Sequence, residues 1–167
     1  MNKIKYIIII TILSFIFGES KKYRLTPIQN QKIRQARTLE NNGLNKQAKD
    51  IYYELFLESP YLKEAFYPLK KILKNQDDIE NLKKIYPLYL KENNNSVTAK
   101  IDVIDIMIWI NDNRWEKTVE EIINNSSIKE KYLKSTLNVL LKNNKNIENY
   151  IDIIRRKRNE DFFSYEL

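Results

Sequence analysis

The chain contains no cysteine and no histidine among its 167 residues. Without cysteine it cannot form a disulfide, present a thiolate nucleophile or bind zinc through sulfur. Without histidine it lacks the usual general base and the commonest metal ligand. An enzyme built from this sequence would have to work with carboxylates alone. We therefore expect a protein that is not an enzyme and that holds no cofactor and no metal ion.

Glycine and proline are also scarce, with two and four residues respectively. A β-sheet protein needs many such residues in its hairpin turns, so this scarcity favours helices joined by short loops. Hydrophobic residues make up 43% of the chain and charged residues 31%. This balance is typical of a folded domain and not of a disordered tail or a membrane protein.

The first twenty residues have the layout of a secretory signal peptide. Lys3 and Lys5 precede a mostly apolar run at 6–17, and Gly18 and Ser20 are small residues at positions −3 and −1 of a cleavage after Ser20. A helix of about twelve residues spans roughly 18 Å, less than the roughly 30 Å of a bilayer core. We therefore expect an exported protein, periplasmic or extracellular, that is anchored to the membrane only if the leader is retained.

Apolar residues recur every thirty-four residues through the rest of the chain. One column consists of Leu39, Leu73, Met107 and Leu141, and a second consists of Ile51, Ile85, Val119 and Ile153. A fixed period of this length indicates stacked helical hairpins that bury their apolar faces against one another. We predict an all-α protein, a right-handed α-solenoid of about four helix–turn–helix repeats, preceded by a signal-peptide helix.

Turn residues divide each repeat into two helices. The predicted breaks fall at 41–43, 75–78, 111–113 and 143–144. Pro68 and Pro87 fall inside predicted helices, where we expect each to be accommodated by a kink. We divide the chain into a signal peptide at 1–20, a linker at 21–26, a repeat domain at 27–159 and a C-terminal cap or tail at 160–167.

This pattern resembles the tetratricopeptide-repeat family, whose unit is a thirty-four-residue helix–turn–helix. The first repeat carries the resemblance, with Ala36 at the small-residue position of its first helix and Ala48, Tyr52 and Pro60 in and after its second. Small residues let the paired helices approach closely, and the aromatic ring fills the gap beside them. The later repeats have larger residues where the first has Ala48, namely Leu82, Glu116 and Tyr150.

In this family the first helices of successive repeats line a concave groove, and the resemblance implies that the groove binds a protein or peptide. It implies the following groove residues: Arg37, Asn41, Tyr67, Lys71, Lys74, Asn75, Asp105, Trp109, Lys142 and Asn143. Asparagine side chains can both donate to and accept from a peptide backbone. Trp109 either anchors the ligand or belongs to the core.

Two other functions fit parts of the sequence. A net charge of +7 would suit a helical-repeat RNA binder, but Glu40 and Asp105 interrupt the groove and the leader directs the chain outward. Asp102 and Asp105 could serve acid–base chemistry in a carboxylate enzyme. We expect instead that both face solvent, opposite the apolar stripe of their helix. The basic run at 155–158 suits the negative end of the last helix dipole.

We predict that the exported protein begins at Lys21. Mass spectrometry of protein recovered outside the cytoplasm should give the mass of residues 21–167. A Ser20→Phe variant should remain uncleaved, because the −1 position of a leader requires a small side chain. Recovery of the wild-type chain in the cytosol with Met1 intact would contradict the prediction.

Overall fold

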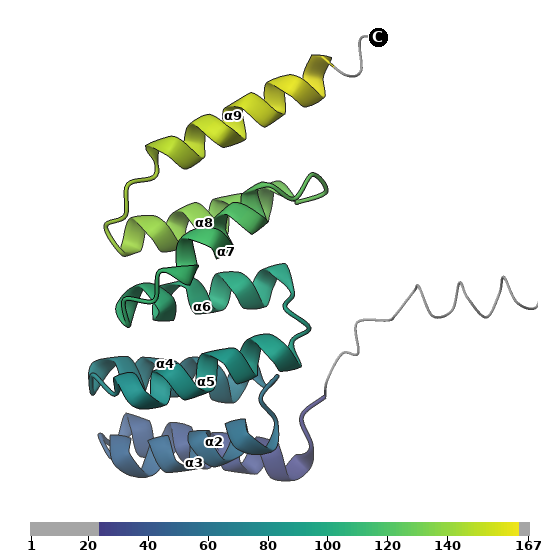
Figure 1. Ribbon diagram of the computed structural model, residues 1–167. Coiled ribbons are helices and arrows are strands. Elements are labelled where there is room, and N and C mark those ends of the chain that lie inside the picture. Colours follow the sequence, from purple (N-terminus) through teal and green to yellow (C-terminus); the bar gives the residue numbers. More distant parts are fainter. Residues whose placement is uncertain (1–23, 164–167) are drawn as a thin grey trace, which may run out of the picture. The chain divides into compact units, whose positions relative to one another are not determined.

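The computed structural model describes the backbone of residues 24–163 and the side chains of residues 24–156. Within this part the chain forms eight α-helices and no strand (Figure 1), so the predicted all-α class is confirmed. The helices are α2 (Pro27–Asn41), α3 (Asn45–Glu58), α4 (Lys63–Asn75), α5 (Ile79–Glu92), α6 (Val97–Trp109), α7 (Arg114–Ile123), α8 (Glu130–Lys142) and α9 (Glu148–Phe163).

The chain divides into two compact units, residues 1–31 and 32–167. The described part of the first unit contains the start of α2, where the Thr26 hydroxyl accepts from the Gln29 amide at 3.1 Å and the Gln29 side chain accepts from the Thr26 amide at 3.0 Å. This reciprocal capping satisfies two amides that the helix leaves free, and Pro27 needs no donor at the first helical position. The predicted signal peptide lies outside the described residues.

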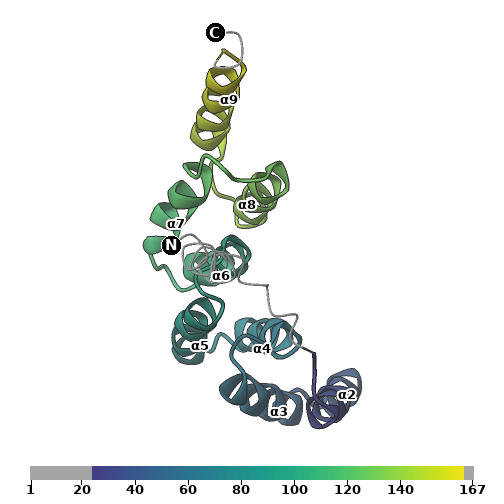
Figure 2. The same ribbon diagram turned by 90° about the vertical axis from the view of Figure 1, so that its right-hand side faces the viewer.

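In the second unit each helix packs on the next from α3 to α8, and α6 also packs on α8 and α7 on α9. Figure 2 shows α4 and α8 along one side of this unit, α5 and α7 along the other, and α6 between them. Ala36 and Ala48 are completely buried, as a close approach of paired helices requires. The rings of Phe66 and Tyr89 stack 3.7 Å apart between α4 and α5.

All four helical hairpins turn with the same backbone motif. In each, one residue has a left-handed conformation: Gly43, Asp77, Asn111 and Asn144. The amide of the following residue donates to a carbonyl five positions back, in the pairs Leu44–Leu39, Asp78–Leu73, Asp112–Met107 and Lys145–Leu140, at 2.8–3.0 Å. This closure is the Schellman motif, which favours Gly, Asn and Asp because their backbones tolerate positive φ. The four predicted breaks between helices are confirmed.

The fourth repeat is one residue out of the predicted register. Leu141 is 52% exposed, whereas Leu140 is completely buried and supplies the carbonyl that closes the turn. The first apolar column therefore continues from Met107 to Leu140, and the assignment of Leu141 to it was wrong. The reason is that α8 begins thirty-three residues after α6, while α6 begins thirty-four after α4.

A similar shift affects α7. Glu116, expected in place of Ala48, is exposed, and the adjacent Trp115 is buried. Of the second apolar column, Ile85 and Val119 are completely buried, whereas Ile51 and Ile153 are only partly buried. Extrapolating a constant period thus misplaces side chains wherever a repeat differs by one residue.

The other expected boundaries differ only slightly from the structure. The helices α4 and α5 continue through Pro68 and Pro87, and α9 continues to Phe163, beyond the expected end of the repeats at 159. Between residues 24 and 163, no helix is both long enough and apolar enough to cross a bilayer.

We predict that the register of α8 can be verified by two neighbouring substitutions. Leu140→Ala should lower the free energy of unfolding by about 3 kcal/mol, because it leaves a cavity in the core. Leu141→Ala should change it by no more than about 0.5 kcal/mol. Urea unfolding followed by circular dichroism measures both values, and equal losses from the two variants would contradict the observed register.

Candidate functional site

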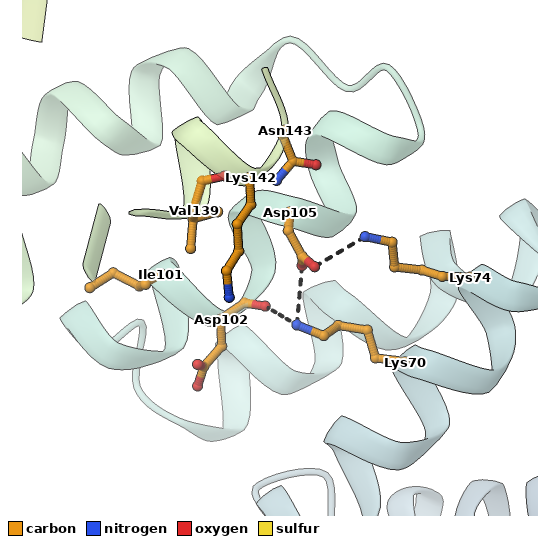
Figure 3. A pocket seen from close by; sticks show the side chains of 8 residues that line it. All are labelled: Lys70, Lys74, Ile101, Asp102, Asp105, Val139, Lys142 and Asn143. Atoms are coloured by element: carbon orange, nitrogen blue, oxygen red, sulfur yellow. Dashed lines mark hydrogen bonds and ion pairs between the residues drawn. The ribbon is translucent and has the colours of Figure 1, made fainter. Parts of the chain in front are cut away.

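Three hollows lie on the exposed face formed by α4, α6, α8 and the C-terminal part of α2, which we call the first-helix face. The amide hollow, of about 410 Å³, is lined by Glu40, Asn41, Asn45, Lys71, Ile72, Asn75 and Gln76. The lysine hollow, of about 310 Å³, is lined by Lys70, Lys74, Ile101, Asp102, Asp105, Val139, Lys142 and Asn143 (Figure 3). The hydroxyl hollow, of about 300 Å³, adjoins it and is lined by Thr98, Ile101, Asp102, Tyr132, Ser135, Asn138, Val139 and Lys142.

In the lysine hollow one carboxylate holds two ammonium groups. Lys70 Nζ and Lys74 Nζ each donate to Asp105, to separate oxygens and both at 3.1 Å. Lys70 also donates to the main-chain carbonyl of Asp102 at 3.0 Å. The Lys142 side chain extends from α8 toward Lys70 and Asp102 (Figure 3), and its ammonium group has no hydrogen bond or ion pair with any residue in the described part of the chain. The hollow therefore contains one cation that the chain itself does not neutralise.

Asp102 lies deeper between α4, α5 and α6. Its Oδ2 accepts from the hydroxyls of Tyr67 and Tyr89, both at 2.8 Å, and lies 3.4 Å from Lys63 Nζ. Its side chain is only 15% exposed. Three partners thus satisfy a carboxylate that burial alone would destabilise.

The expectation that Asp102 and Asp105 face solvent was wrong. Side chains around most of the circumference of α6 are buried, namely Ala99, Ile101, Val103, Ile104, Ile106 and Met107. The helix therefore has no broad solvent-exposed stripe, and its two carboxylates face α4. A partly buried carboxylate needs donors, and the lysines and tyrosines of α4 and α5 supply them.

Burial also determines how the tyrosines of this interface titrate. Loss of solvent raises the pKa of Tyr89 far above its usual value, and the negative charge of Asp102 raises that pKa further. Burial and then the hydrogen bond to Asp102 raise the pKa of Tyr67 in the same way. Both hydroxyls therefore stay protonated and act as donors over the whole physiological pH range.

The amide hollow combines one ion pair with several free carboxamides. Lys71 Nζ lies 2.9 Å from Glu40 Oε1. Among residues 24–156, the side chains of Asn41, Asn45 and Asn75 have no hydrogen-bond partner. These groups are free to donate to and accept from another chain.

The structure brings together most of the groove residues expected from the sequence. Lys74, Asp105, Lys142 and Asn143 line the lysine hollow, while Asn41, Lys71 and Asn75 line the amide hollow. Tyr67 lies beside the lysine hollow through its bond to Asp102. Arg37 is exposed but lines neither hollow.

Two of the expected groove residues, Trp109 and Asn143, make contacts within the chain that the sequence did not reveal. Trp109 is 45% exposed, so of the two readings left open for it the structure excludes the core, and Lys74 Nζ lies 4.7 Å from the centre of its ring. Asn143 already donates to the carbonyl of Val139 in its own helix, at 2.8 Å. Of the three expected groove asparagines, only Asn41 and Asn75 have wholly free carboxamides.

Lys70 was missed at the level of sequence. It precedes Lys74 by four residues, which places both side chains on one face of α4. The spacing of three between Asp102 and Asp105 likewise places both carboxylates on one face of α6. Together the two spacings predict that two lysines of one first helix face two carboxylates of the next. This signal could have identified Lys70.

Comparisons with known proteins do not assign the chain, because no family model, curated protein or solved structure matches it. Among the described residues, no group of three or more His, Cys, Asp or Glu side chains could hold a metal ion.

We predict that Tyr89→Phe will lower the free energy of unfolding by about 1.5 kcal/mol at neutral pH. The variant removes one of three donors to a partly buried carboxylate. Tyr53→Phe is the matched control, because the Tyr53 hydroxyl lies 3.4 Å from its acceptor on Asn81, and its loss should change stability by no more than about 0.5 kcal/mol. Urea unfolding at pH 7 measures both.

The same pair of variants has a defined pH dependence. In the unfolded chain tyrosine ionises near its usual pKa of about 10, whereas burial keeps the pKa of Tyr89 higher in the folded state. The folded state therefore binds the extra proton, and the stability contributed by Tyr89 falls as pH rises above about 10. Between pH 10 and 11 the wild type should lose up to about 1 kcal/mol more than Tyr89→Phe; parallel curves would contradict this account.

Proposed function

We propose that this protein is an exported, non-catalytic scaffold that holds an extended peptide or protein segment on its first-helix face. The observation that carries the proposal is the set of polar groups on that face that the chain leaves unpaired. Asn41, Asn75 and Lys142 come from three different first helices, and each lines a hollow. Groups of this kind, distributed over successive helices, suit a ligand that runs along them.

The proposal includes a helical-repeat architecture similar to that of tetratricopeptide repeats. Four hairpins with the same turn motif, at intervals of thirty-three or thirty-four residues, support it. The packing of α6 on α8 and of α7 on α9 supports it as well, because equivalent helices of adjacent repeats lie next to each other in a solenoid. In such an array the first helices form a continuous binding surface.

An extended segment is the ligand that best fits these hollows. A peptide in this conformation leaves its backbone amides and carbonyls unpaired, and carboxamide side chains can serve both. Trp109, with its exposed ring, would provide an apolar contact of the kind that often contributes strongly to binding. The layout of the first twenty residues supports action outside the cytoplasm.

The charge pattern disfavours RNA as the ligand. Recognition of a phosphate backbone requires lysines and arginines that are free along one face. On the first-helix face, Lys71 pairs with Glu40, and Lys70 and Lys74 pair with Asp105. A bound nucleic acid would have to approach both carboxylates.

We predict that Trp109→Ala combined with Lys71→Glu will weaken partner capture about tenfold, which corresponds to the loss of about 1.4 kcal/mol. A photoreactive side chain at Asn75 of the full chain, activated in the native envelope, measures the capture. The matched control combines Leu57→Ala with Lys83→Glu, because it also changes one exposed apolar residue and one exposed lysine. Helicity should remain unchanged in both variants.

The outcome separates the two faces of the molecule. Loss in the first double variant alone supports binding on the first-helix face. Equal capture by all three proteins would mean that the partner binds elsewhere and would exclude the proposed function.

A further inference from the structure

We propose that the bound segment is acidic, an inference that rests on the proposed function and assigns the ligand chemistry of the lysine hollow. An internal Glu or Asp side chain of the partner pairs with Lys142. An apolar side chain two residues away lies on Ile101 and Val139. The recognised motif is therefore apolar-x-acidic, in either chain direction.

The charge in the lysine hollow supports an anionic side chain. Three ammonium groups, those of Lys70, Lys74 and Lys142, face the single carboxylate of Asp105, which is shared by the first two. Asp102 does not offset this excess, because two tyrosine hydroxyls and Lys63 already interact with its Oδ2. A carboxylate brought by the partner would neutralise Lys142, whose side chain is exposed, and would lie close to the ammonium groups of Lys70 and Lys74, so that electrostatic complementarity favours an anion there.

The shape of the site supports a peptide in preference to a small anion. The lysine and hydroxyl hollows share Ile101, Asp102, Val139 and Lys142 and so form one continuous trough. Along α8 the trough is lined by Ser135, Asn138, Val139 and Lys142. It thus runs from hydroxyl and amide groups, over an apolar floor, to an ammonium group.

The rise along α8 is compatible with the spacing of the motif. From residue 135 to residue 142 a helix rises roughly 10 Å, the length of about three extended residues. Side chains two residues apart in an extended peptide lie on one face and are separated by roughly 7 Å. One of them can therefore lie on the apolar floor while the other reaches Lys142.

Asp105 is a built-in competitor of the ligand. It occupies Lys70 and Lys74, which would otherwise be free to contact the incoming carboxylate. Its removal should strengthen the binding of acidic peptides, although it lies in the site. An increase in affinity distinguishes the proposal from a role in which Asp105 itself contacts the ligand, because removal of Asp105 would then weaken binding.

Fluorescence anisotropy with the full chain and short labelled peptides tests the inference. Four peptides with amidated C-termini share one polar sequence and differ only at the motif: Val-Ser-Glu, Val-Ser-Gln, Val-Ser-Lys and Ser-Ser-Glu. The Val-Ser-Glu peptide should bind about fivefold more tightly than the Gln peptide, and the Lys peptide should bind most weakly. Replacing Val by Ser should also weaken binding.

Two substitutions on α8 and one on α6 complete the test. Lys142→Gln should abolish the preference for Glu over Gln. Lys134→Gln, which removes a 72% exposed lysine that pairs with Glu130 on the same helix, should leave the preference intact. Asp105→Asn should raise the affinity for the Glu peptide about threefold, with circular dichroism as the check on folding.

The outcomes separate this inference from the proposed function. Peptide binding at the first-helix face without preference for Glu, or with preference unaffected by Lys142→Gln, would overturn the acidic motif and leave the scaffold role standing. Binding that appears only when the amidated peptides are replaced by ones with a free C-terminal carboxylate would overturn it as well. If none of the peptides binds, the acidic motif is excluded, and the capture at Asn75 then decides the scaffold role independently.

Discussion

The left-handed turn that closes each helical hairpin is the constraint on which the rest of the structure depends. It reverses the direction of the chain after each first helix. A backbone amide just after the turn donates a hydrogen bond to a carbonyl in the last turn of that helix. In the first three hairpins the residue that supplies this carbonyl comes from the apolar column: Leu39, Leu73 and Met107. The turn thus sets the rotation of the first helix, and with it the side chains that face outward. The hollows on the first-helix face are a consequence of this repeated orientation.

Most of the charged groups on this face form contacts between helices of the chain itself. Lys70 and Lys74 of α4 reach Asp105 of α6, and Tyr67 of α4 reaches Asp102 of α6. These bonds join the successive first helices α4 and α6 through polar side chains. Because Asp105 serves two lysines and Lys142 has no partner among the described residues, the same arrangement leaves positive charge available. The contacts between α4 and α6 and the proposed binding of an anionic segment therefore depend on one set of side chains.

Much of the fold could be predicted from the sequence because the signals are local and periodic. The scarcity of glycine and proline indicated helices, and the Asn, Asp and Gly clusters located the turns. Both depend on the backbone preferences of single residues. The register of α8 could not be predicted, because a repeat shortened by one residue keeps its pattern but shifts its numbering, so Leu140 takes the place assigned to Leu141.

The candidate site was predictable in part for a similar reason. Positions on the outer side of the first helices follow from helical phase, and the hollows contain seven of the expected residues. The partners of Asp102 and Asp105 did not follow, because they depend on which neighbouring helix faces the carboxylates. Trp109 was ambiguous because an aromatic residue at the end of an apolar run has the same local pattern whether it is buried or exposed.

The one-residue difference in the fourth repeat has a consequence for how such a chain can change over time. A change of one residue in a loop, as between α6 and α7 where Trp115 takes the place equivalent to Ala48, alters the interval for all later residues. The closing turn of the next hairpin still forms from its own residues. Loops that connect the helices can therefore differ in length by a residue while the helices keep their packing. The length of a connecting loop can therefore vary while the first-helix face keeps its geometry.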